Sequence, residues 1–119
     1  MTIRYVVLLY DDEAAGESAT PDERRRIMDR HGAFPRVCAE HGIAIAGGEA
    51  LQTSDTATTL RRRGEEITIT DGPFAETAEQ LGGFYLLDAP DLDSVLKAIA
   101  QLPEYSLEVR PVDPAPGGS

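Results

Sequence analysis

Two short stretches of this chain are apolar at every position, and they constrain the fold more than any other feature. Residues 5–10 read Tyr-Val-Val-Leu-Leu-Tyr and residues 84–87 read Phe-Tyr-Leu-Leu. Successive side chains of a β-strand point to opposite faces of its sheet, so a strand that is apolar throughout needs cover on both faces. We therefore expect each stretch to lie in a strand whose two faces are both buried.

Two further segments predict helices. Thr20, Pro21 and Glu23 form a helix start, because threonine caps a helix, proline suits its first position and glutamate completes a capping box. This helix is expected to run to about His41, with Gly42 as its C-terminal stop. A second helix, ended by a proline, is indicated by apolar residues at helical spacing, namely Leu92, Val95, Leu96, Ile99 and Leu102.

Additional strands complete the predicted order of elements. Strands are expected near residues 43–46 and 107–110, and residues 58–63 with 66–70 indicate a hairpin. The order is β-α-β-(hairpin)-β-α-β. Two helices cover only one face of one sheet, so the other face needs a different cover, and a second copy of the chain is the simplest candidate. We therefore expect a homodimer.

The segment between the hairpin and the second doubly apolar strand resembles a known family. It begins Asp71-Gly72-Pro73-Phe74, which resembles the signature of the DGPF branch of the YCII-related proteins. Residues 76–77 and 79–85 fit the same pattern, and the resemblance extends from residues 5–10 to residues 108–112. It implies ferredoxin-like α+β subunits that pair sheet to sheet as a dimeric α+β barrel.

Length, composition and charge bound the class of protein. The chain has 119 residues, which suits one domain, and its 41% apolar and 27% charged residues are ordinary for a globular protein. The formal net charge of −10 argues against nucleic-acid binding, which needs a basic face. We expect residues 1–112 to form the domain and residues 113–119 to form a disordered tail.

Cysteine content and hydropathy indicate a cytoplasmic protein without a membrane partner. Cys38 is the single cysteine, so no disulfide forms within the chain, as is usual in a reducing cytosol. The apolar run at residues 5–10 is too short to cross a bilayer.

His31 is the first candidate for chemistry. On a helical wheel it shares one stripe with Ile27, Phe34, Cys38 and His41, so it faces the sheet rather than water. A partly buried core histidine that bonds a backbone carbonyl is the alternative interpretation.

Asp71 is the second candidate. It ends a predicted strand, and an Asx-turn is its alternative role. The family resemblance implies a histidine and an aspartate brought together in a cleft, which correspond to His31 and Asp71 here. A carboxylate that orients an imidazole produces a pair suited to general acid–base work near neutral pH.

Four further residues are candidates for a ligand pocket. Tyr10 ends the first strand, although a tyrosine at the edge of the core fits equally well. Glu49 follows two glycines that let the backbone approach a ligand. The alternative interpretation of Glu49 is a solvated carboxylate at the end of a strand. Phe74 and Glu76 belong to the signature segment. The alternative interpretation of Glu76 is that it shapes the loop rather than binding a ligand.

No cofactor or metal is expected. His31 and Cys38 are seven residues apart on one helix, about 10 Å, which is too far for one ion. The chain carries no glycine-rich nucleotide-binding motif.

Three functions remain open from the sequence. The first is a small-molecule lyase or isomerase that uses His31 and Asp71 as an acid–base pair. The second is a non-catalytic ligand-binding or regulatory partner module, which the resemblance associates with extracytoplasmic-function sigma factors. The third is a structural dimer whose signature segment only shapes the fold.

Overall fold

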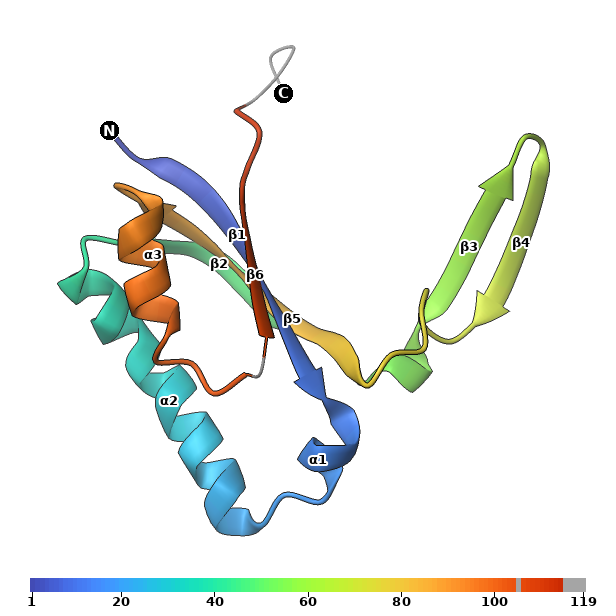
Figure 1. Ribbon diagram of the computed structural model, residues 1–119, viewed down its shortest axis with the longest axis horizontal. Coiled ribbons are helices and arrows are strands. Elements are labelled where there is room, and N and C mark those ends of the chain that lie inside the picture. Colours follow the sequence, from blue (N-terminus) through green and yellow to red (C-terminus); the bar gives the residue numbers. More distant parts are fainter. Residues whose placement is uncertain (105, 115–119) are drawn as a thin grey trace.

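A computed structural model describes residues 1–104 and 106–114. Its main element is a four-stranded antiparallel sheet in the order β2-β5-β1-β6 (Figure 1). The strands are β1 (Ile3–Asp12), β2 (Ala44–Ala50), β5 (Glu79–Ala89) and β6 (Ser106–Pro111). The doubly apolar strands β1 and β5 occupy the centre. The predicted ferredoxin-like α+β fold is thereby confirmed.

The two long helices begin where the sequence predicts. Helix α2 (Pro21–Glu40) is capped by Thr20, whose hydroxyl oxygen accepts from the Glu23 amide at 3.1 Å. Helix α3 (Leu92–Ile99) is capped by Asp91, whose carboxylate accepts from the Ser94 amide at 2.8 Å. Each cap satisfies an amide that has no partner inside the helix. Two short elements follow strands, α1 (Glu13–Glu17) and the 3-10 helix η1 (Ser54–Thr56).

The core lies between the two long helices and one face of the sheet. In β1, Tyr5, Val7 and Leu9 are buried, whereas the residues between them are only half-buried. This alternation shows that one face of the sheet is covered, and α2 and α3 both contribute residues to the core on that face. The remaining core residues come from both helices, β5 and the connections, namely Phe34, Cys38, Ile43, Leu87, Ala89, Val95, Ala98, Ile99 and Leu102.

The opposite face of the sheet is apolar at its centre. Val6 is paired with Leu86 and Leu8 with Phe84, and all four side chains are half-buried. Neither long helix lies on this face, because both cover the other one. The expectation that a second copy covers it stays a prediction for this single chain.

A separate hairpin projects from the four-stranded sheet, and we call residues 58–71 the arm. It consists of β3 (Thr58–Arg63) and β4 (Glu66–Asp71), which pair only with each other, as predicted. Its turn contains Gly64 at φ +62°, a conformation that favours glycine. Figure 1 shows the arm extending away from α2 and α3.

Two predicted boundaries differ from the structure. A loop was expected after β1, but Asp12 accepts hydrogen bonds from the amides of Ala14 and Ala15 and starts α1. Strand β5 begins at Glu79, five residues before the apolar stretch, so the signature connection shortens to residues 72–78. Pairing with β1 through backbone groups extends β5, and this pairing needs no apolar side chains.

Strand β2 continues through Gly47-Gly48 because β5 lies unusually close there. A Cβ atom on Gly48 would lie 2.7 Å from the Phe84 carbonyl oxygen, and one on Gly83 would lie 2.9 Å from that of Glu49. The glycines therefore permit this pairing rather than weaken the strand.

Two further predictions concern the tail and membranes. Residues 115–119 of the expected disordered tail lie outside the described residues. Among the residues that the structure describes, no helix is long and apolar enough to cross a membrane.

Replacing Phe34 with alanine is expected to destabilise the protein by about 3–5 kcal/mol, because the ring is fully buried and its loss leaves a cavity. Met28→Ala on the same helix is the control, since Met28 is 71% exposed and should change stability by less than about 0.5 kcal/mol. Denaturant unfolding at one protein concentration measures both. Small and equal changes in the free energy of unfolding for the two variants would contradict the described core.

Candidate functional site

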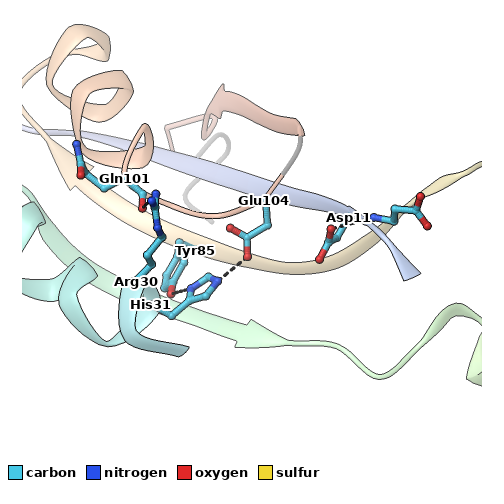
Figure 2. Close-up of polar contacts among 7 residues, drawn as sticks. Asp11, Arg30, His31, Tyr85, Gln101 and Glu104 are labelled. Atoms are coloured by element: carbon cyan, nitrogen blue, oxygen red, sulfur yellow. Dashed lines mark hydrogen bonds and ion pairs between the residues drawn. The ribbon is translucent and has the colours of Figure 1, made fainter. Parts of the chain in front are cut away.

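His31 makes two side-chain hydrogen bonds at the inner face of α2. Its Nδ1 lies 2.9 Å from the Tyr85 hydroxyl and its Nε2 lies 2.5 Å from Glu104 Oε1. Figure 2 shows the imidazole between these two side chains. We call the three residues the His31–Tyr85–Glu104 relay. The alternative of a core histidine bonded to a backbone carbonyl is therefore not what the structure shows.

Three separate elements position the relay. His31 stands three residues before Phe34 on α2, and the Phe34 ring packs 4.7 Å from the ring of Tyr85 on β5. Glu104 lies in the connection between α3 and β6. Arg30 donates to the Gln101 carbonyl of this connection at 3.3 Å, as Figure 2 also shows. The relay is therefore held by packing on one side and by a backbone contact on the other.

The environment of Tyr85 assigns the direction of the hydrogen bonds. Burial, reinforced by the nearby charge of Glu104, raises the pKa of the Tyr85 phenol, so the phenol keeps its proton. A neutral imidazole then accepts from Tyr85 at Nδ1 and donates from Nε2 to Glu104. This arrangement resembles a hydroxyl–imidazole–carboxylate triad, in which the carboxylate fixes the tautomer of the ring.

The relay opens into a cavity of about 380 Å³. Leu9 contributes apolar surface to the cavity, and Asp11 adds a carboxylate to that of Glu104. Glu49 and Phe84 also line it, but they are directly opposed in the sheet and their side chains point to its other face. Neither lysine nor arginine is among the described residues that line it. The cavity therefore has an acidic character that disfavours anionic ligands.

Two carboxylates of this cavity are partly withdrawn from water. Glu104 Oε2 is buried and has no hydrogen-bond partner among the described residues. Burial raises the pKa of Asp11, an effect that a backbone hydrogen bond from Asp12 opposes and the charge of Glu104 reinforces. Asp11 is therefore placed to accept a proton, and Glu104 Oε2 is placed to accept a hydrogen bond from a ligand.

The predicted pair of His31 and Asp71 does not form within the chain. Asp71 ends β4 and lines a different cavity of about 710 Å³, while both ring nitrogens of His31 are engaged by Tyr85 and Glu104. The family resemblance placed Asp71 in one cleft with His31. The structure places it on the arm, which leads away from α2 (Figure 1).

The four predicted pocket residues fall into three cavities. Glu49 lines the cavity of His31. Tyr10 and Phe74 line another of about 610 Å³, and Glu76 lines the one that contains Asp71. The later part of the signature segment, including Gly82 and Gly83, thus lines the His31 cavity, whereas its first residues line the other two cavities.

Sequence reasoning missed Tyr85, Glu104 and Asp11. Tyr85 carries a detectable signal, because a tyrosine in a doubly apolar strand brings a hydroxyl that needs a partner when buried. Glu104 follows Pro103 in an irregular connection, where no periodicity indicates which way a side chain points.

The structure also describes residue types that bind metals or act as nucleophiles in other proteins. Among the described residues, no three His, Cys, Asp or Glu side chains come close enough to share a metal ion. Burial raises the pKa of the Cys38 thiol to about 11, so this cysteine is a protonated core residue rather than a nucleophile.

Comparison with known proteins identifies the family. Residues 3–114 match the YCII-related domain. A protein of Rhizobium meliloti (strain 1021), whose name describes it as uncharacterised, is 38% identical over 113 residues, which cover 91% of this chain and 90% of the relative. Both matches extend over nearly the whole chain. The chain therefore belongs to the YCII-related family.

Proposed function

We propose that this protein is a small-molecule lyase or isomerase in which the His31–Tyr85–Glu104 relay transfers a proton. The observation that carries the proposal is the position of the relay, since hydroxyl, imidazole and carboxylate are hydrogen-bonded in series at the wall of a cavity. The earlier hypothesis of an acid–base histidine is kept, with Tyr85 and Glu104 in place of Asp71 as its partners.

The proton transfer follows from the hydrogen bonds. The Tyr85 oxygen takes a proton from the substrate while its own proton moves to His31 Nδ1. The imidazolium that results is stabilised by the Glu104 carboxylate at Nε2. The reverse transfer returns a proton to another substrate atom, which completes an isomerisation, or protonates a leaving group, which completes an elimination.

The lining of the cavity suggests the class of substrate. Asp11 and Glu104 present carboxylates to it, and neither lysine nor arginine is among the described residues that line it. Like charges at close range repel in a partly dry site. We therefore propose a neutral or cationic substrate rather than a carboxylate or phosphate.

A regulatory partner module is the second candidate. The observation that favours it is the exposed apolar surface of the arm, because large exposed apolar patches mark binding sites for other molecules. The resemblance to the DGPF branch, which rests on Asp71-Gly72-Pro73-Phe74, makes a sigma-factor partner the specific form of this candidate.

Tyr85→Phe and His31→Gln are expected to lower catalysed proton transfer by about 10²–10⁴-fold each, because either change interrupts the relay. The double variant should be little worse than either single variant. The measurement is deuterium uptake from solvent into a panel of neutral and cationic carbonyl compounds, followed by NMR.

His41→Gln is the matched control. His41 lies at the end of the same helix, and its Nδ1 bonds the Val37 carbonyl at 2.9 Å, so its loss should leave deuterium uptake unchanged. Ligand binding that survives without any uptake in the wild type would favour the non-catalytic module and contradict the enzyme.

Asp11→Asn is expected to raise the melting temperature at pH 7. The pKa of Asp11 is raised by burial, so the folded state binds the proton more tightly than the unfolded state. This contribution to stability is present at low pH and is lost as pH rises through the folded pKa. The increase in melting temperature caused by Asp11→Asn should therefore shrink as pH falls toward about 4, where the Asp11 carboxyl of the unfolded chain also becomes protonated.

Thermal melting between pH 3 and pH 8 measures this dependence. Asp113→Asn changes an exposed carboxylate and serves as the control, with little effect at any pH. A gain from Asp11→Asn that grows toward low pH would show that Asp11 is not a destabilised carboxylate.

A further inference from the structure

The cavity of the relay has one wall that consists mostly of main chain. Strands β2 and β5 pair there, with Glu49 opposite Phe84 and Ala50 opposite Gly83. The side chains of Glu49 and Phe84 point to the other face of the sheet, and the next lining residue on β5, Gly82, has no side chain. Along this wall the cavity therefore meets main-chain atoms and the methyl group of Ala50. We call these five residues the floor.

The close pairing of the two strands explains Gly83 but not Gly82. A Cβ atom on Gly83 would lie 2.9 Å from the Glu49 carbonyl oxygen, which excludes a side chain. A Cβ atom on Gly82 would meet only the Leu9 carbonyl oxygen, at 3.9 Å, which is an ordinary contact. The φ angle of Gly82 is not positive, so its backbone conformation does not require glycine either. Packing and conformation within the described chain thus leave Gly82 without a structural reason.

The position of Gly82 in the cavity supplies a functional reason. Gly82 is exposed and lines the cavity of His31, and Leu9, which holds its nearest atom, lines the same cavity. The space beside Gly82 is therefore cavity space rather than packed protein. Glycine weakens a strand, and it marks places where a ligand approaches the main chain closely. A glycine at this position keeps the floor free for a ligand.

A second observation in the same cavity points to a ligand. The Glu104 side chain is only 11% exposed, and its Oε2 is buried without a hydrogen-bond partner among the described residues. A buried oxygen without a donor is costly, so a donor on a ligand would stabilise it. Asp11 provides a further acceptor at the cavity. A ligand that fits this cavity therefore combines hydrogen-bond donors with a part that lies on main chain.

We propose that the substrate carries a flat, conjugated group with N–H or O–H donors, and that Gly82 selects this group by keeping the floor bare. The inference rests on the proposed function, since it names the substrate class of the same cavity. A flat group contacts an even main-chain surface with all its atoms, whereas a puckered ring contacts it with only some and gains less dispersion energy. The floor adjoins Tyr85 on β5, so a group that lies on it is beside the relay.

Benzamide and cyclohexanecarboxamide test the flat group with the wild-type protein. Both compounds are neutral and carry the same amide donors, but only benzamide has a flat ring. NMR titration of the His31 ring signals measures both dissociation constants. Benzamide is expected to bind about fivefold more tightly or better, because its whole ring contacts the floor. A smaller ratio, or no binding of benzamide, would overturn the proposal.

Gly82→Val tests the selecting residue. Its branched side chain occupies the space above the floor and is expected to weaken benzamide binding by about tenfold or more. The melting temperature should not fall, because valine favours strands and glycine does not. A Gly82→Val protein that is folded and binds benzamide as the wild type does would overturn the proposal.

Gly47→Val is the matched control. Gly47 also lies inside a strand without a positive φ, and a Cβ atom there would meet only Leu86 Cδ1, at 3.7 Å. Gly47 is not among the described residues that line the cavity. Its replacement should change benzamide affinity by less than about twofold, because the new side chain lies outside the cavity. Equal losses of affinity in the two variants would count against a selecting role for Gly82.

Binding of these amides and deuterium uptake fail independently. Selective binding of benzamide needs no proton transfer, so it persists even where the relay transfers no proton. Deuterium uptake that depends on Tyr85, together with equal affinities for the two amides, would keep the proposed function and remove the flat substrate class.

Discussion

The packing of α2 against one face of the sheet is the constraint on which both the core and the candidate site depend. Phe34 is fully buried, and its ring packs on Tyr85. The same contact fixes His31 one turn earlier, at hydrogen-bond distance from the Tyr85 hydroxyl. Because both long helices lie on that face, the opposite face and the arm stay uncovered in a single chain. A cavity and two uncovered apolar surfaces thus follow from one packing arrangement.

Much of the fold was predictable because its signals are local. Thr20 and Glu23 mark the start of α2, and the spacing of apolar residues marks α3. The uninterrupted apolar runs at residues 5–10 and 84–87 predict strands with both faces covered, and β1 and β5 lie at the centre of the sheet. The start of β5 at Glu79 was not predictable in this way, since backbone pairing with β1 extends it. Helix α1 was not predicted for a similar reason. Asp12 caps this helix only because the chain turns after β1.

The candidate site was predictable only in part. His31 was found because helical periodicity shows which side of α2 faces the sheet. Asp71 was assigned to the same cleft on family resemblance, but the sheet that a strand joins is a tertiary property, and β4 joins β3 alone. Glu104 lies in a connection without periodicity, so only the three-dimensional structure brings it to His31.

The protonation state of the His31 ring tests the central claim most directly. Nitrogen-15 NMR of the histidine side chains, at a pH where the ring is neutral, distinguishes the two tautomers. The relay predicts a proton on Nε2 and none on Nδ1, because Tyr85 donates to Nδ1 and Glu104 accepts from Nε2. It also predicts that Glu104→Gln and Tyr85→Phe shift the His31 signals and leave those of His41 in place. A proton on Nδ1 of neutral His31, or His31 signals that neither variant moves, would contradict the relay.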